Sequence, residues 1–173
     1  TPAVIEFVGI AGLVKGASKG EGLGNKFLEN IRRTDAIVHV VRCFDDENII
    51  HVEGGADPKR DIEIIELELI MADMELVERR IEKAKKAGKG GDKKFLREAE
   101  VFEGLYAHLN EGRSARSYDC PEEELELIST CDLLSLKPVI YAANLDEAGM
   151  AAYRENAYYR AVEEIAAAEG AQV

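Results

Sequence analysis

The sequence has few cysteines, and they are not arranged to hold a metal ion. Cys43, Cys120 and Cys131 are an odd number with no C-x-x-C spacing, and no histidine is placed to complete a metal site with them. Secreted domains that depend on disulfides carry an even set of cysteines. We therefore expect a reduced intracellular protein with no metal site.

Long apolar runs are also missing. No run approaches the roughly 18 residues of a membrane span, and the N-terminus has neither the basic nor the apolar segment of a signal peptide. These absences predict a cytoplasmic protein with no membrane partner.

Positive charge is scarce, because 22 Lys and Arg face 34 Asp and Glu, giving a formal net charge of −12. Such a chain is not a general binder of polyanions, so any nucleic-acid contact has to be local. One local excess stands out. Six lysines lie within residues 83–94, and they either simply solvate a charged tip of the fold or contact RNA phosphates. They are Lys83, Lys85, Lys86, Lys89, Lys93 and Lys94.

Two catalytic signatures are absent. The chain has no G-x-x-x-x-G-K-[ST] motif, which would supply a phosphate cradle and its lysine, and no H-E-x-x-H motif. The three histidines, His39, His51 and His108, fall on separate expected elements. A metal or triad site built on histidine is therefore not indicated.

Glycine, in contrast, is concentrated near the N-terminus. Residues 4–8 predict an apolar strand, and glycine then recurs every two to four residues. Glycine lets the backbone reach positive φ and lie close to a ligand, and such loops after strands carry the chemistry of open α/β sheets. The loop should order and disorder with its ligand. Its glycines are Gly9, Gly12, Gly16, Gly20, Gly22 and Gly24.

Strands and helices alternate toward both ends of the chain. A nearly continuous apolar run at 36–44 predicts a strand covered on both faces, as in a parallel sheet, and residues 137–143 predict a third apolar strand. A helix over 24–33 would complete a right-handed βαβ unit with the first two strands. Two further helices are expected, one from 121 to about 131 or 134 and one over 150–169. Residues 171–173 resemble the start of another strand.

The middle of the chain predicts two long helices, over 61–86 and 92–111. Since the linker 87–91 can only be a turn, the helices should form an antiparallel coiled-coil arm that projects from the domain, with one apolar seam and otherwise charged faces. The fold class is therefore α/β, a partial and mostly parallel sheet with an inserted helical hairpin. The expected divisions are 1–60 and 117–173 for the two parts of the α/β domain and 61–116 for the arm.

The last strand ends in Asn144-Leu145-Asp146-Glu147. An Asn and an acid at this spacing can hold a nucleobase at the carboxyl end of a strand. A turn followed by a helix N-cap explains the same residues, and alone the motif does not decide between the two.

Several runs together resemble one family. The segment 6–27, with 39–44, 90–93 and 136–138, closely resembles the YchF subfamily of Obg-related P-loop NTPases. The resemblance covers nearly the whole chain and implies the middle of a nucleotide-binding domain with its helical arm. It implies Mg²⁺ and ATP or GTP as cofactors, and the ribosome or RNA as a partner through the arm tip.

The resemblance also implies residue roles. Gly9 to Gly12 match the D-x-x-G element, in which the glycine amide senses the terminal phosphate, and Leu13 stands where other GTPases place the glutamine that orients water. His51 matches a loop histidine that is expected to orient the water instead. Asn144, Leu145 and Glu147 lie in the base-reading N-x-x-E motif. The glutamate implies relaxed or adenine-leaning selectivity.

The chain departs from the family at two points. Gly9 replaces the aspartate that supports magnesium, and the P-loop, first switch and C-terminal domain would lie outside both ends. We therefore expect a piece of an ATP/GTP-hydrolysing switch protein that binds nucleotide weakly by itself. The alternative is a non-catalytic module that binds RNA or a protein through the arm. Whether this chain is an enzyme, and its oligomeric state, stay open.

Overall fold

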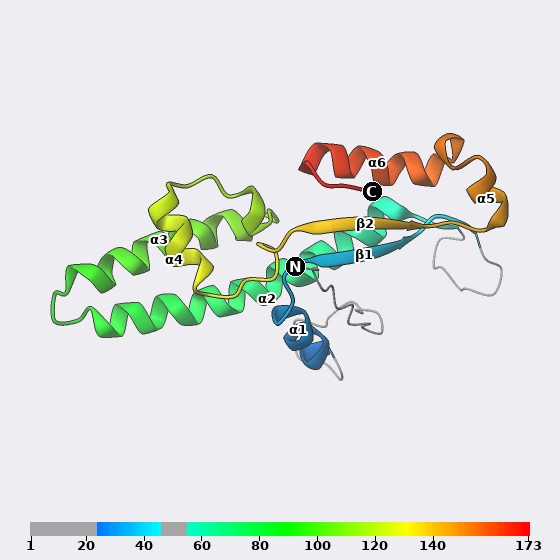
Figure 1. The fold of residues 1–173 in the computed structure, drawn as a ribbon. Coiled ribbons are helices and arrows are strands. Elements are labelled where there is room, and N and C mark those ends of the chain that lie inside the picture. The colour runs from blue at the N-terminus through cyan, green and yellow to red at the C-terminus, as the bar shows by residue number, and fades with distance from the viewer. Residues whose placement is uncertain (1–23, 46–54) are drawn as a thin grey trace, which may run out of the picture.

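The computed structural model describes residues 24–45 and 55–173, and its centre is a short parallel sheet. Strand β1 (Ile37–Arg42) pairs with β2 (Val139–Asn144), with Ile37 opposite Val139 and Arg42 opposite Asn144. Strand β1 is rich in β-branched residues and β2 begins with two of them, and such residues suit a pleated, half-buried surface. Because the strands are parallel, both carboxyl ends lie at one edge of the sheet (Figure 1).

Helices α2 (Pro58–Ala87) and α6 (Ala157–Glu169) cover one face of this sheet. Ile62 of α2 and Val162 of α6 are buried in one cluster with Val41 of β1. Fully burying an aliphatic side chain of this size stabilises a fold by about 1.5–3 kcal/mol. This cluster therefore holds α2 and α6 to the sheet.

The other face is open in the described part of the chain. Val38, Val40 and Ile140 are 44%, 64% and 42% exposed. The expected cover on both faces is therefore seen on one face only. Near the last residue of the sequence, Gln172 forms an isolated parallel bridge with Ile140, in the segment 171–173 that resembles the start of a strand.

Helix α1 (Gly24–Arg32) agrees with its predicted range to within one residue. Its buried side chains, Leu28 and Ile31, pack in a cluster with Leu69 of α2 and with Leu134. The three-residue spacing of Leu28 and Ile31 gives the helix one apolar face, and that face lies on α2.

Helices α2 and α3 (Lys93–Asn110) form the antiparallel arm, which extends away from the sheet (Figure 1). Each helix begins at an aspartate cap: Asp57 accepts from the Arg60 amide, and Asp92 accepts from the Lys94 amide at 3.0 Å. Between the helices, Gly91 has a φ of +85°, which favours glycine. The predicted hairpin is confirmed.

The arm has a wider core than one seam. Phe102 and Leu105 of α3 are fully buried, and Val77 of α2 lies in the same cluster. Helix α4 (Glu122–Ser129) adds Ile128, so α3 packs against a second helix as well as against α2. The expectation of a single apolar seam with charged faces elsewhere is therefore wrong for α3.

The last predicted helix, over 150–169, is also wrong at its start. The chain forms α5 (Glu147–Ala151) and the 3₁₀ turn η3 (Tyr153–Glu155) before α6 begins. The cause is Asn156, whose side-chain oxygen accepts hydrogen bonds from the backbone amides of Tyr158 and Tyr159 at 2.8 and 3.1 Å. This N-cap starts a new helix. Gly170 ends α6 with a φ of +70°, as expected.

The division into 1–60, 61–116 and 117–173 stays a prediction. In the structure α2 contributes to both the sheet core and the arm core, and α4 packs on the arm. Among the described residues, no helix combines the length and the apolar character that crossing a membrane requires.

Candidate functional site

The predicted base-reading residues lie at the carboxyl edge of the sheet. Asn144 is the last residue of β2, and its carbonyl oxygen accepts a hydrogen bond from the Cys43 amide at 2.8 Å, which ties the ends of the two strands together. Glu147 is the first residue of α5. Both side chains are exposed, and neither has a hydrogen bond within residues 24–45 and 55–173.

The two residues between them have structural roles. Asp146 is the N-cap of α5, because its Oδ1 accepts the Gly149 amide at 2.8 Å. Leu145 is half-buried and packs against the cluster beneath the sheet. The interpretation of this motif as a turn and a helix N-cap therefore applies to Leu145 and Asp146. Asn144 and Glu147 are left available to a ligand, while a base contact by Leu145 stays a prediction.

A second group of contacts lies at the end of β1. One carboxylate oxygen of Asp45 accepts the Ala56 amide at 2.9 Å, and Tyr158 of α6 donates its hydroxyl to the same carboxylate at 2.9 and 3.0 Å. These two donors lower the pKa of Asp45, chiefly through the Ala56 amide. A Cβ added at Gly55 would lie 3.0 Å from the Asp45 Oδ1, so a larger residue there would push on this carboxylate.

This Asp45 contact joins the two flanks of the segment 46–54, and it does so beside the end of β1. Neither Asp45 nor Tyr158 stands out in the sequence as a site residue. No local signal marks either residue, because their partners lie 11 and 113 positions away.

The other predicted site residues are less informative. Gly24 is the first residue of α1. The remaining ones lie outside the described residues: Gly9, Gly12, Leu13, Gly16, Gly20, Gly22 and His51. Their roles stay predictions. Among the described residues there is no group of three His, Cys, Asp or Glu side chains that could hold a metal ion.

A shallow cavity of about 570 Å³ lies over η3 and α6. Its walls include Arg154, Tyr153 and Tyr159. The two tyrosine rings pack edge to face, with their centroids 5.1 Å apart. None of the predicted site residues lines it. The cavity therefore does not support the base-reading assignment.

At the arm tip, all six lysines predicted to form a basic cluster are exposed. Lys85 pairs with Glu103 at 2.8 Å. The other five have no ion pair within the described part of the chain, so their charges face solvent: Lys83, Lys86, Lys89, Lys93 and Lys94.

Comparison with known proteins bears on the fold and the family of this chain. No protein-family model matches the chain. Proteins named Ribosome-binding ATPase YchF from Haemophilus influenzae and Bacillus subtilis are 51% and 49% identical to it over 172 residues. These alignments cover 99% of the chain and 47% of each relative, so the chain spans about half the length of the curated relatives it matches.

A solved structure, the Schizosaccharomyces pombe YchF GTPase, matches with a TM-score of 0.77 and 39% identity. It covers 92% of the chain and 44% of that protein. The parallel strands, the N-x-x-E turn at their carboxyl ends and the helices packed on the sheet define part of a P-loop NTPase-like α/β fold. Within that class the chain belongs to the YchF family, as the sequence motifs predicted.

Proposed function

We propose that this chain carries the central part of the nucleotide-binding domain of a cytoplasmic, ribosome-associated switch protein that hydrolyses ATP or GTP. The proposal rests on Asn144 and Glu147, which are both exposed at the sheet edge. Neither takes part in the helix cap that their neighbour Asp146 forms. The names of the relatives support it, since they include a ribosome-binding ATPase and a GTPase.

Base selectivity is the most direct test. In other GTPases an aspartate at the position of Glu147 pairs with guanine, whereas the longer glutamate relaxes that preference. Hydrogen bonds to charged groups are worth about 1.5–3 kcal/mol. In the longer protein that carries this chain, Glu147→Asp should therefore shift the ratio of GTP to ATP affinity by about tenfold or more.

The matched control is Glu155→Asp, the same substitution at an exposed position of η3. An unchanged ratio in Glu147→Asp, or an equal shift in the control, would remove Glu147 from the base site.

For hydrolysis we propose that Gly12 senses the terminal phosphate and that His51 positions the water, because Leu13 is apolar. Mg²⁺ and the P-loop would come with the rest of the protein, so the chain alone should bind nucleotide weakly. Magnesium-dependent ATP turnover by the purified 173-residue chain, above that of a His51→Ala variant, would support the role of His51 but contradict the expectation that the chain alone binds nucleotide weakly.

For the arm we propose contact with ribosomal RNA through the five tip lysines that have no ion pair among residues 24–45 and 55–173. Each phosphate contact adds about 0.7–0.9 to the slope of log affinity against log salt. Lys89→Ala, at the turn, should lower that slope by about one contact in ribosome sedimentation. Lys59→Ala, on an exposed lysine at the start of α2, serves as the control. A slope that does not respond to Lys89→Ala speaks against an RNA contact there.

The second candidate function is a non-catalytic module that binds its partner only through the arm. The exposed lysines at the tip favour it. Ribosome binding that is retained while nucleotide affinity is absent from the longer protein is the result that selects this alternative.

A further inference from the structure

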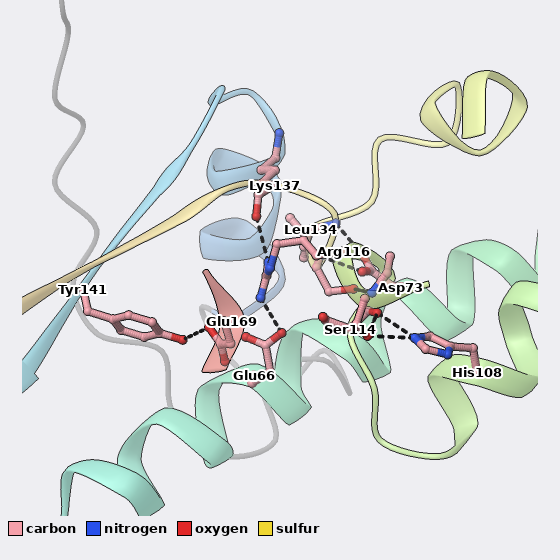
Figure 2. Close-up of polar contacts among 12 residues, drawn as sticks. Glu66, Asp73, His108, Ser114, Arg116, Leu134, Lys137, Tyr141 and Glu169 are labelled. Atoms are coloured by element: carbon pink, nitrogen blue, oxygen red, sulfur yellow. Dashed lines mark hydrogen bonds and ion pairs between the residues drawn. The ribbon is translucent and has the colours of Figure 1, made fainter. Parts of the chain in front are cut away.

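Lys137 lies where α1, the sheet and the arm meet, and none of the roles above involves it. Its ammonium group donates a hydrogen bond to the carbonyl oxygen of Thr34, in the turn after α1. A cation at the carboxyl end of a helix satisfies a free carbonyl and interacts well with the helix dipole. Its own carbonyl oxygen accepts a hydrogen bond from Arg116 Nη1 at 2.8 Å (Figure 2).

Arg116 carries the connection to α2. It lies in the short 3₁₀ turn η2 (Ala115–Ser117), and its Nη2 contacts Glu66 Oε1 at 2.6 Å. Both side chains are only about a fifth exposed, at 20% and 21%. Burial raises the pKa of Glu66, and the charge of Arg116 opposes this. Because it is partly buried, this ion pair is weakened less by salt than an exposed pair would be.

The segment before Lys137 is held to the same helix. Asp73 of α2 is fully buried, and its two carboxylate oxygens accept the amides of Leu134 and Ser135 at 2.8 and 2.7 Å. The Ser135 hydroxyl in turn accepts the Ala115 amide at 2.9 Å. We call residues 133–137 the strap, because they join α2 to the sheet.

Helix α1 rests directly on the strap. Leu28 and Ile31 pack with Leu134 and with Leu69 of α2, so two kinds of contact, apolar packing and the Lys137 hydrogen bond, join α1 to the base of the arm. In sequence, α1 begins at the last glycine of the loop predicted to respond to nucleotide. A displacement of α1 must therefore be absorbed by the strap or passed to α2.

We propose that Lys137 is a positioning residue that couples α1 to the helical arm, so that the nucleotide state alters how the arm binds its partner. This inference rests on the proposed function, because it needs both a nucleotide response and a ribosome contact. It predicts that the coupling, measured as the ratio of ribosome affinities with and without ATP, depends on Lys137.

The test uses the full-length protein and purified ribosomes, with affinities measured by sedimentation in the presence and absence of ATP. Lys137→Met keeps most of the side-chain volume and removes the ammonium donor. It should bring the affinity ratio about 2- to 30-fold closer to one, the range for substitutions along such contact networks. Lys137→Arg keeps a donor and should retain the ratio.

Lys59→Met is the control, because it makes the same change on an exposed lysine of α2. Where Lys137→Met does not fold, Glu66→Gln weakens the same link at α2, because it removes the charge that pairs with Arg116 and leaves only a neutral acceptor. A ratio that is unchanged in Lys137→Met or Glu66→Gln, or reduced equally in Lys59→Met, overturns the inference. A wild-type ratio of one instead overturns the proposed nucleotide switch itself, so the two failures are distinguishable.

Discussion

Gly104, in the middle of α3, provides a sharp test of how the arm is packed. An alanine in a helix interior is favoured over glycine by about 1 kcal/mol. A Cβ at this position, however, would lie 2.6 Å from the Tyr118 hydroxyl oxygen. The Tyr118 ring also packs against His108, with centroids 5.1 Å apart, so it has little room to retreat.

Overpacking of this kind costs about 1–3 kcal/mol. The clash should therefore cancel or exceed the gain in helix propensity, and Gly104→Ala should change the free energy of unfolding by about zero to −2 kcal/mol. For a chain of this size that is a fall in Tm of up to about 4–8 °C. Chemical and thermal unfolding followed by circular dichroism measure both quantities.

The Tyr118→Phe background isolates the cause. Without the hydroxyl, the nearest Tyr118 atom to the new Cβ is the ring carbon at 3.8 Å, an ordinary contact. Gly104→Ala should then stabilise the protein by up to about 1 kcal/mol. If Gly104→Ala stabilises both backgrounds equally, the Tyr118 hydroxyl does not lie over α3 and the reasoning is refuted.

Three further predictions concern side chains that accept hydrogen bonds from other parts of the chain. Asn156→Ala removes the side-chain acceptor of two amides at the start of α6 and should cost about 1 kcal/mol in unfolding, with Asn156→Asp as the conservative control. Tyr158→Phe removes one of the two donors that lower the pKa of Asp45, so this pKa should rise toward its ordinary value in an NMR titration of the carboxyl carbon. Because a lowered carboxyl pKa stabilises the fold above the unfolded pKa, the acid-induced loss of stability should be smaller in Tyr158→Phe; an unmoved Asp45 pKa would contradict the contact. Asp73→Ala leaves two buried amides without an acceptor and should cost about 2–5 kcal/mol, whereas a loss below about 1 kcal/mol would show that water reaches them.

Much of this fold follows from local patterns in the sequence. The apolar spacing in α1, α2 and α3 located each helix to within a few residues, because a buried helical face repeats every three to four positions. The turn at the tip of the arm could also be predicted, because a short glycine-rich linker between two long helices can only form a turn. The Asn144 to Glu147 motif was found at its strand end, although its division into ligand-facing and structural residues needed coordinates.

What the sequence could not show depends on partners that are distant along the chain. Asp73 lies on the apolar face of α2, three or four positions from the buried Leu69, Ile70 and Val77, but the sequence does not say which groups this acid binds. Its partners lie 61 and 62 positions away. The break before α6 was missed for another reason. Helical periodicity continues through 150–169, and the capping geometry of Asn156 decides against it.

The composition of α2 determines how the arm can move. The helix runs for 30 residues with no glycine and with proline only at its first position, so it lacks the usual causes of a kink. It also contributes Ile62 to the sheet core and Val77 to the arm core. A bend at residue 61, where the predicted division would place a boundary, would have to break both the helix and the packing of Ile62, so we expect the arm to move by tilting as one lever.

The size of that movement follows from helix geometry. From Asp73, where the strap is attached, to Ala87 at the tip is about 21 Å along the axis. A tilt of about 10° at the strap would carry the tip lysines about 4 Å, more than the length of a hydrogen bond. Contacts at the strap can thus decide whether the tip reaches a phosphate, which is why substitutions there should alter the nucleotide dependence of binding rather than binding alone.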